Sequence, residues 1–378
     1  MAKIFTARYL VPIDAPPIVG GALLAQAGKI IAVGQANEIK RANPGVEIVD
    51  FEEAIITPLL VNAHTHLELT DFPHWAQKAG ETADPDSFVD WILRLIRVKR
   101  GLTKKQYSQS VANGIQQSLA AGTGVVGDIL SQYASRKAYR NAKLHGVLFL
   151  ESLGHDPTII NSVKQELRNI LAEENVGYVR LGLSPHSPYT ISAEYLADIF
   201  SKCSRQQLPC STHLSESTEE VAFIERSKGA IAERFYPFVG WEYLLPKAKR
   251  IRPAAYLKKQ GGLFTENLLV HGVQLDQSEI DLLAAKRMTL ALCPRSNARL
   301  KVGKAPIGKL LSAGVRLCLG TDSLASNDSL SIWDEIAFAR SWFAGEVDAP
   351  TLLSMATIGG SQALGLSDQF GSLSVGKS

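Results

Sequence analysis

The sequence predicts an α/β protein, in which a (β/α)8 TIM barrel is joined to a small β-sandwich-like domain. Apolar runs of strand length follow one another from residue 59 onward, and helix-length segments separate them. Polar residues that can take part in chemistry come at the C-terminal ends of these runs. Parallel strands covered on both faces are apolar with little alternation, and repeated strand–helix units close into a barrel. The active sites of such barrels lie at the C-terminal ends of the strands.

The small domain is expected to begin at the N-terminus. Residues 1–57 contain short strand-like runs that Gly and Pro separate, and β-branched residues are common in them. These runs lie at 3–11, 21–34 and 46–57. We expect residues 58–360 to form the barrel and residues 361–378 to return to the small domain.

Eight runs after residue 58 are assigned to the barrel strands. In chain order they are LLVNAHTH (59–66), TGVVGDIL (123–130), GVLFLESLG (146–154), VRLGLSPHS (179–187), PCSTHLSES (209–217), NLLVHGVQL (267–275), TLALCPRSN (289–297) and RLCLGTDSL (316–324). Segments such as 192–206 and 278–287 have the length of the intervening helices. Eight strand–helix repeats are the number that closes a TIM barrel.

The composition is that of a globular protein with a large core, since 46% of the 378 residues are hydrophobic and 20% are charged. The formal net charge is +3, and no basic tract indicates a nucleic acid partner. No apolar run is long enough to span a membrane, and the N-terminus lacks the apolar core of a signal peptide. The four cysteines form no CxxC pair, which argues against a disulfide scaffold and a cysteine zinc site. We therefore expect a reduced, cytoplasmic protein that acts on a small molecule, with neither nucleic acid nor membrane as partner.

Two histidines, His64 and His66, end the first run of the barrel. Side chains two residues apart in a strand point to the same face, so these imidazoles can converge on one point. His213 ends the fifth run and Asp322 the eighth. Each residue alone is better explained as a satisfied polar side chain, but together they form a donor set at one barrel face. Three imidazoles and one carboxylate suit zinc or ferrous iron, so the sequence predicts one divalent metal ion.

Two further residues fit a proton-transfer role. Glu216 lies three residues after His213, and His271 ends the sixth run. A carboxyl group close to the metal, but not bound to it, can shuttle a proton to a ring nitrogen or leaving group. Glu216 is the candidate, and the alternative is a glutamate at a helix N-terminus, because SESTEE has capping character. His271 would hydrogen-bond the attacking water.

The chain resembles the amidohydrolase superfamily, in its cytosine-deaminase-like and chlorohydrolase-like branch. The motifs that carry the resemblance are NAHTHLE (62–68), SPHSPYT (184–190), THLSES (212–217), LLVHGVQL (268–275), CPRSN (293–297) and GTDSLASN (320–327). They occur in the order of the family and extend over nearly the whole chain.

The resemblance implies one zinc or iron ion held by His64, His66, His213 and Asp322. It implies that Asp322 deprotonates the metal-bound water, that Glu216 carries a proton to the ring nitrogen, and that His271 orients the hydroxide. His186 resembles the substrate-contacting histidine of the family. Relatives with two metals carry a lysine on the fourth strand, and VRLGLSPHS has none, so a mononuclear site is expected. Homodimers are usual in the family.

The chain departs from the family at its C-terminal end. Relatives usually continue after a GSL-x-x-GK turn with strands that complete the small domain. This sequence reaches GSLSVGKS (371–378) and stops. We therefore expect this part of the small domain to be incomplete.

The substrate that the resemblance favours is 6-amino-6-deoxyfutalosine, an intermediate of menaquinone synthesis, deaminated with release of ammonia. The alternatives are S-adenosylhomocysteine or methylthioadenosine deamination, hydrolytic dechlorination of a triazine, and a catalytically inactive barrel scaffold. Glu68 is a candidate for binding ribose hydroxyls, and the alternative is a solvated loop residue.

Futalosine-type and homocysteine-type substrates carry a carboxylate, which an arginine can bind. Arg94 and Arg97 lie on the expected amphipathic helix 88–100, and one of them is the candidate clamp. The alternative is a cover helix with solvated arginines.

The remaining polar candidates are assigned by their place along the runs. Arg295 and Asn297 are expected to bind substrate, and Cys293 to line the pocket wall. Asp128 and Glu151, at the ends of the second and third runs, either line the pocket or pair with neighbours. His74, His145 and His155 are expected to be structural.

Overall fold

The barrel strands follow one another in chain order around a single parallel sheet. The computed structural model describes residues 1–173 and 176–378. The strands are β8 (Leu60–Thr65), β9 (Thr123–Leu130), β10 (His145–Ser152), β11 (Val179–Pro185), β12 (Cys210–Leu214), β13 (Asn267–His271), β14 (Thr289–Leu292) and β15 (Arg316–Leu319). Every neighbouring pair in this sheet is parallel. All eight predicted strands are confirmed, and most end before the polar residues that close the predicted runs.

The barrel is closed between its first and last strands by polar contacts. Thr65 and Asp322 form an isolated parallel bridge. The amide of Asn62 donates to Thr321 Oγ1 at 2.8 Å, and the backbone N–H of Thr321 donates back to Asn62 Oδ1 at 3.0 Å. The N–H of Asp322 donates to the carbonyl of His64 at 3.1 Å. These contacts bring the ends of β8 and β15 side by side.

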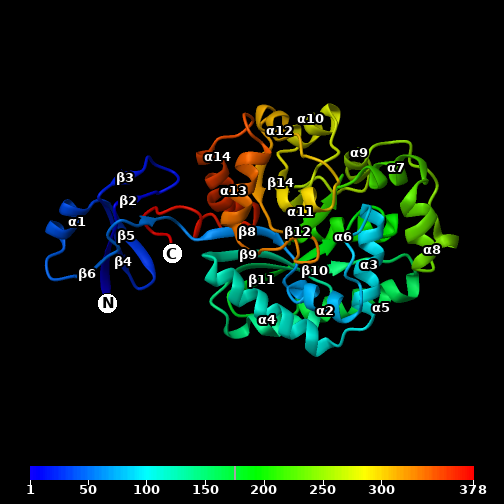
Figure 1. The fold of residues 1–378 in the computed structure, drawn as a ribbon, viewed down its shortest axis with the longest axis horizontal. Helices are drawn as coiled ribbons and strands as arrows, with labels where there is room; N and C mark the ends of the chain where they lie inside the picture. Colours follow the sequence, from blue (N-terminus) through cyan, green and yellow to red (C-terminus); the bar gives the residue numbers. More distant parts are fainter. Residues whose placement is uncertain (174–175) are drawn as a thin grey trace.

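Helices surround the barrel and supply the outer layer of the core (Figure 1). The longer ones are α3 (Phe88–Arg100), α4 (Lys104–Ala120), α5 (Pro157–Leu171), α6 (Ala193–Gln206), α7 (Thr218–Arg226), α10 (Gln277–Ala285) and α13 (Ile332–Trp342). Side-chain caps fix where several begin: Ser192 accepts from the N–H of Tyr195, and Asp276 forms a capping box with Glu279. The helix predicted at 88–100 has the bounds of α3.

Shorter helices complete the layer and line the loops. They are α2 (Phe72–Lys78), α8 (Tyr236–Phe238), α9 (Pro253–Lys259), α11 (Pro294–Arg299), α12 (Ile307–Ser312), α14 (Ala349–Ser354) and α15 (Gly360–Ala363). Single turns or short π and 3-10 segments lie at Leu67–Leu69, Tyr133–Asn141, Ile231–Phe235, Glu242–Leu244 and Met355–Gly359. Among the described residues, no helix is both long and apolar enough to cross a bilayer.

The small domain stands beside the barrel and contains two sheets (Figure 1). One is β5-β4-β1-β6, built from β1 (Ala2–Thr6), β4 (Gly21–Gln26), β5 (Lys29–Gln35) and β6 (Glu47–Asp50). The other is β3-β2-β7, built from β2 (Tyr9–Leu10), β3 (Ile18–Val19) and β7 (Ile55–Ile56). Helix α1 (Ala36–Ala42) packs against the first sheet through Ile39.

The last residues of the chain lie against this domain. The N–H of Ile30 donates to the carbonyl of Lys377 at 2.8 Å, and the N–H of Gly376 donates to the carbonyl of Ile30 at 2.8 Å. Leu373 is buried in an apolar cluster with Leu10 and Leu23. The C-terminal segment therefore packs with the N-terminal strands, as the sequence suggested.

Candidate active site

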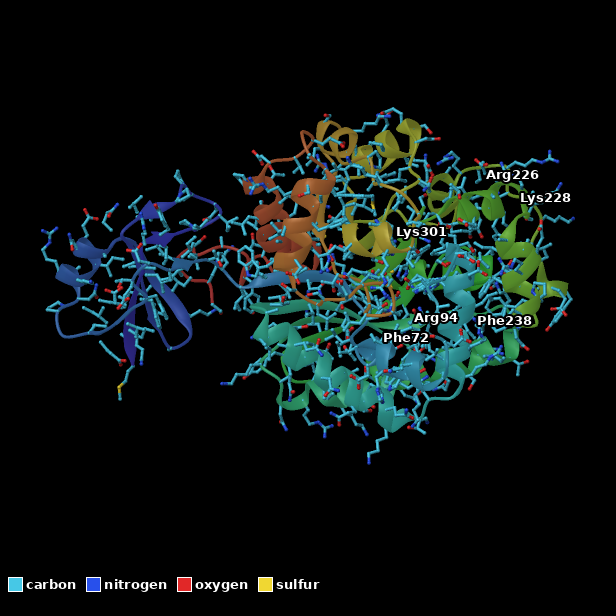
Figure 2. The ribbon with its side chains drawn as sticks, in the orientation of Figure 1. Phe72, Arg94, Arg226, Lys228, Phe238 and Lys301 are labelled. Atoms are coloured by element: carbon cyan, nitrogen blue, oxygen red, sulfur yellow. The ribbon has the colours of Figure 1, made fainter. Side chains whose placement is uncertain are left out.

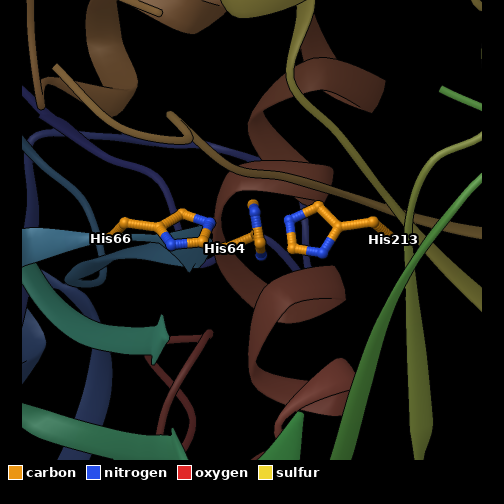
Figure 3. Close-up of side chains that lie close together, drawn as sticks. All are labelled: His64, His66 and His213. Atoms are coloured by element: carbon orange, nitrogen blue, oxygen red, sulfur yellow. The ribbon is translucent and has the colours of Figure 1, made fainter. Parts of the chain in front are cut away.

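Three histidines converge at the C-terminal face of the barrel. His64 lies in β8, His66 follows it, and His213 lies in β12. Their ring centroids are 5.0 Å (His64–His66), 4.8 Å (His64–His213) and 5.5 Å (His66–His213) apart. Figure 3 shows the three rings pointing toward one another, and one nitrogen of each lies within 4.8 Å of the others. His64 and His66, two residues apart in the sequence, therefore point to the same side, as their spacing predicts.

The unsatisfied ring nitrogens of His64 are the clearest sign that the three histidines bind a ligand. The residue is fully buried, and neither ring nitrogen has a hydrogen-bond partner among the described residues. Two unsatisfied buried nitrogens cost free energy unless something binds them. Burial, together with the neighbouring imidazoles, lowers the pKa of His66 and of His213 well below the usual value. Neutral imidazoles are the form that binds a metal ion.

Asp322 completes the donor set from the opposite side of the barrel seam. Its Oδ1 lies 3.7 Å from Nε2 of His64 and 3.5 Å from Nε2 of His66. Its Oδ2 accepts hydrogen bonds from the hydroxyls of Ser296 at 2.6 Å and Ser326 at 2.8 Å. The two serines thus engage one oxygen while the other faces the imidazoles. Asp322 has a φ of 57°, a conformation in which a residue other than glycine is strained.

His213 is held in a defined tautomer. Its Nδ1 lies 2.8 Å from the carbonyl oxygen of His186. A carbonyl only accepts, so Nδ1 carries the proton and Nε2 keeps its lone pair for a metal ion. Such contacts to the second nitrogen are typical of metal-binding histidines. Three neutral nitrogens and one carboxylate oxygen fit a divalent ion, and this donor chemistry suits zinc or ferrous iron.

Glu216 and His271 lie next to Asp322 in the same cavity, as the sequence predicts. Oε1 of Glu216 is 3.6 Å from Nε2 of His271. Burial, and then the charge of Asp322, raises the pKa of Glu216 well above its usual value, which favours its protonated form. Burial lowers the pKa of His271 to about 4. An acid whose protonated form is favoured therefore lies next to a neutral imidazole.

Two supporting contacts orient this pair. Oδ1 of the buried Asn297 lies 3.0 Å from Nδ1 of His271, so Nδ1 donates and Nε2 faces the cavity as an acceptor. The N–H groups of Ser215 and Glu216 both donate to Glu220 at 2.9 Å. Asn297 therefore acts through His271, and it does not line the cavity.

The cavity above these groups has a volume of about 370 Å³. One face of α3 forms an apolar wall, and polar groups gather at its deep end. The wall residues are Trp91, Ile92, Leu95 and Ile96; the polar residues include Lys99, Glu151, Gln132 and His186. Nδ1 of His186 lies 3.0 Å from the hydroxyls of both Ser187 and Thr190. None of the hydrogen bonds among the described residues involves its other nitrogen, so the contact of His186 with substrate stays a prediction.

Glu68 is buried, which excludes the solvated-loop alternative. It is 1% exposed and accepts from the backbone N–H groups of Ser131 at 2.9 Å and Gln132 at 3.0 Å. It also pairs with Lys99 at 3.5 Å. With its oxygens engaged by protein groups, Glu68 does not line the cavity, contrary to its expected contact with ribose.

The structure does not bring Arg94 or Arg97 to the cavity. Nε of Arg94 donates to the carbonyl of Glu81 at 2.8 Å, and its guanidinium lies over the ring of Phe72 at 5.6 Å (Figure 2). Nη2 of Arg97 donates to Oε2 of Glu81 at 2.9 Å. The cavity-facing stripe of α3 recurs at spacings of three and four residues and reaches Lys99 and Arg100 instead. The expected arginine clamp at Arg94 or Arg97 is therefore not found in this arrangement.

Other candidates also lie outside the cavity. Arg295 pairs with Asp328 and lies 3.6 Å from Asp334, so it turns away from the metal-ligand group. Asp128 is buried and accepts from the N–H of Leu67 at 2.8 Å and from Tyr139 at 2.7 Å. Cys293 is buried outside the cavity lining.

The remaining histidines lie away from the donor set. His74 is exposed, and His145 packs against Phe370 with ring centroids 4.6 Å apart. His155 lines a second cavity with Tyr236, whose hydroxyl lies 3.2 Å from its Nε2. Sequence reasoning missed Ser296, Ser326 and Lys99. Only Lys99 had a signal, because it continues the stripe through Trp91 and Leu95.

Known proteins resemble this chain over most of its length. The model of the family described as "Amidohydrolase family" matches residues 55–378. A 5-methylthioadenosine/S-adenosylhomocysteine deaminase of Nitratidesulfovibrio vulgaris is 30% identical over 357 residues, covering 91% of this chain and 74% of that protein. An aminodeoxyfutalosine deaminase of Deinococcus radiodurans is 28% identical over 355 residues, covering 91% of this chain and 81% of that protein.

A solved structure supports the fold. The aminofutalosine deaminase of Helicobacter pylori matches with a TM-score of 0.85 at 22% identity, over 100% of this chain and 90% of that one. Since the family model matches well over half of the sequence, this chain belongs to the amidohydrolase family.

Proposed function

We propose that this amidohydrolase is a metal-dependent deaminase of an aminopurine nucleoside. The protein is an enzyme, a hydrolase that acts on carbon–nitrogen bonds other than peptide bonds. The observation that carries the proposal is the pairing, in one cavity, of the histidine group and Asp322 with the buried carboxyl of Glu216. A deaminase needs a nucleophilic water on one side of the ring carbon and a proton for the ring nitrogen on the other.

His64, His66, His213 and Asp322 would hold the metal ion, which we propose to be zinc, with ferrous iron as the alternative. When bound, a divalent ion lowers the pKa of water and so makes a nucleophile available near neutral pH. The orphaned nitrogens of His64 and the single carboxylate oxygen of Asp322 that faces them suit this role.

The residues of this chain then handle the protons. Asp322 accepts a proton from the attacking water, and His271 accepts a hydrogen bond through Nε2 and orients that water. Glu216 delivers its proton to the ring nitrogen as the water oxygen bonds to the carbon that carries the amine. The carbon–nitrogen bond then breaks as the amine takes the proton held by Asp322 and leaves as ammonia. The former water oxygen becomes a carbonyl oxygen, and its remaining proton restores the carboxyl of Glu216.

The group attached to the ribose separates two candidate substrates. Relatives named for aminodeoxyfutalosine and for methylthioadenosine or adenosylhomocysteine support both candidates about equally. Arg100, at the C-terminal end of α3, lines the same cavity as the apolar wall, and its guanidinium lies over the ring of Phe238 at 4.6 Å. An aromatic arm that ends in a carboxylate would match an apolar wall followed by a cation. We therefore propose 6-amino-6-deoxyfutalosine first and the thioether nucleosides second.

The test is ammonia release by metal-loaded protein from a panel of aminodeoxyfutalosine, methylthioadenosine, adenosylhomocysteine, adenosine, guanine and cytosine. Fast release from the first compound alone supports the proposed substrate. Release from the thioether nucleosides instead assigns the second candidate. Release from guanine or cytosine alone, or from none of the six, contradicts a nucleoside deaminase.

A further inference from the structure

The carboxylate of Glu151 faces the cavity without a partner. Glu151 lies near the C-terminal end of β10, is 9% exposed, and lines the cavity. Among residues 1–173 and 176–378, no group donates a hydrogen bond to its carboxylate; only its main-chain carbonyl accepts one, from Tyr133. The deamination described above does not use this residue. Burial raises the pKa of Glu151 to about 7. A carboxylate buried without donors is costly, so this position favours a ligand that supplies them.

Lys99 lines the same cavity and supplies a cation. Its Nζ lies 3.5 Å from Glu68 Oε1 and 3.2 Å from the hydroxyl of Ser131, and its side chain is 25% exposed toward the cavity. Burial acts to lower the pKa of Lys99, but the charges of Glu68 and Glu151 outweigh it and raise the pKa. Lys99 therefore remains an ammonium.

This pair lies in the same cavity as the histidine group. Lys99 and Glu151 line it together with His66, His186 and His213. A ligand that fills this cavity can therefore meet the pair and the histidine group at once.

The two opposite charges restrict which ligand group fits between them. A carboxylate drawn to Lys99 would be repelled by Glu151 and Glu68, and an ammonium drawn to Glu151 would be repelled by Lys99. A neutral group that both donates and accepts satisfies both. Two neighbouring hydroxyls can donate to the oxygens of one carboxylate and accept from one ammonium.

We infer that Glu151 and Lys99 bind the 2′- and 3′-hydroxyls of the substrate's ribose. The inference rests on the proposed function and deepens it, because it makes the intact sugar diol a requirement of the site. It assigns to Glu151 the role that the sequence suggested for Glu68. A free base, or a nucleoside without these hydroxyls, leaves the carboxylate of Glu151 buried without a hydrogen-bond donor.

The test compares 5′-methylthioadenosine with its 2′,3′-dideoxy form. With metal-loaded wild-type protein, we expect kcat/KM to be about 10–100-fold lower for the dideoxy compound. Glu151→Gln lowers kcat/KM for methylthioadenosine by a similar factor and leaves the dideoxy compound unchanged, because the lost interaction is the same one. Glu346→Gln, which alters an acid paired with Lys304 on the surface, is the matched control and changes neither.

Equal turnover of the two compounds by the wild type overturns the inference and leaves the deaminase proposal standing. An equal loss for both compounds in Glu151→Gln overturns it as well, since that is the effect of a structural role. Binding measured by calorimetry on metal-loaded Glu216→Gln protein separates the two proposals. Tighter binding of methylthioadenosine than of the dideoxy compound supports the diol site even if no nucleoside is deaminated, and equal or undetectable binding contradicts it.

Discussion

The hydroxyl of Ser296 donates a 2.6 Å hydrogen bond to Oδ2 of Asp322, while Oδ1 of the same carboxylate faces His64 and His66. One oxygen is therefore fixed by the protein and the other is presented to the histidine group. The side chain has little freedom to rotate, because a second hydroxyl, that of Ser326, engages the same Oδ2. The two oxygens of Asp322 therefore have different roles: Oδ2 fixes the side chain, and Oδ1 is available to a metal ion.

Asp322→Asn removes the negative charge and places an amide where the carboxylate meets the imidazoles. We expect the purified variant to contain far less than one metal ion per chain and to lose ammonia release. Elemental analysis and the deaminase assay measure these effects. Asp328→Asn is the control, since Asp328 is exposed and pairs with Arg295. If Asp322→Asn kept both metal and activity, the assignment of this residue would be wrong.

Glu216→Gln keeps the shape of the side chain but removes its transferable proton. Metal content should stay at the wild-type level, and kcat should fall by about 10²–10⁴-fold. In the wild type, the pKa of Glu216 is raised well above its usual value, so activity that depends on this proton should decline at a higher pH than an ordinary glutamate would give. Near-native turnover in the variant with the metal in place would contradict the proton-shuttle role.

Asn297 positions His271 through a hydrogen bond to Nδ1. Two variants of Asn297 should separate the effect of losing this hydrogen-bond acceptor from the effect of adding a negative charge. Asn297→Ala removes the acceptor at Nδ1 and should lower kcat about 10–100-fold without loss of metal. Asn297→Asp keeps an acceptor and adds a negative charge, which raises the pKa of His271 from about 4. Its kcat/KM should therefore begin to fall at a higher pH on acidification than that of the wild type. If Asn297→Asp and the wild type had identical pH profiles of kcat/KM, His271 would not be an essential group in the reaction.

Arg94 and Arg97 should be dispensable for substrate binding, because both bond Glu81 outside the cavity. Arg94→Gln and Arg97→Gln are expected to change KM by no more than about twofold, as for other exposed or partly exposed pairs. Arg100→Gln should raise KM for aminodeoxyfutalosine and leave KM for methylthioadenosine unchanged. A large effect of Arg97→Gln confined to the carboxylate substrate would restore the arginine clamp at that position.

His155 makes stability depend on pH. Burial lowers its pKa from 6.5 to about 4 in the folded protein. As pH falls below about 6.5, the unfolded chain takes up a proton that the folded protein does not, so the stability present above 6.5 is lost between 6.5 and 4. We expect His155 to account for about 1 kcal/mol of the stability lost between pH 7 and pH 5.

Urea unfolding of His155→Gln at pH 7 and pH 5 measures this contribution. The variant should show a smaller drop in the free energy of unfolding than the wild type between these pH values. His74→Gln, which changes an exposed histidine, should behave as the wild type does. A drop of the same size in His155→Gln would show that other groups cause the loss.

The sequence was sufficient for features that depend on local periodicity. The apolar runs located every barrel strand, and the spacing of His64 and His66 placed both on one face, where the structure finds them. The rule that barrel chemistry lies at the strand ends brought in His213 and Asp322. Whether these four bind a metal stays a prediction.

The sequence failed where a side chain's partners come from distant loops. The backbone N–H groups of Ser131 and Gln132 donate to the carboxylate of Glu68. The motif NAHTHLE gives no indication of these partners. The apolar stripe of α3 was visible, but not that it faces the cavity, so the arginines beside it were favoured over Lys99 and Arg100. The predicted run 267–275 was too long because His271 adopts a positive φ value, which ends the regular pairing of β13.

The contact between β8 and β15 determines when the donor set can form during synthesis and folding. Asn62 and Thr321, which form it, are 259 residues apart in the chain, and His64 and Asp322 stand on either side of the same seam. During synthesis, the histidines emerge from the ribosome long before the aspartate does. The complete donor set exists only once the last strand has docked on the first, so a nascent or prematurely terminated chain cannot assemble it. An active protein must therefore be one in which the barrel has closed.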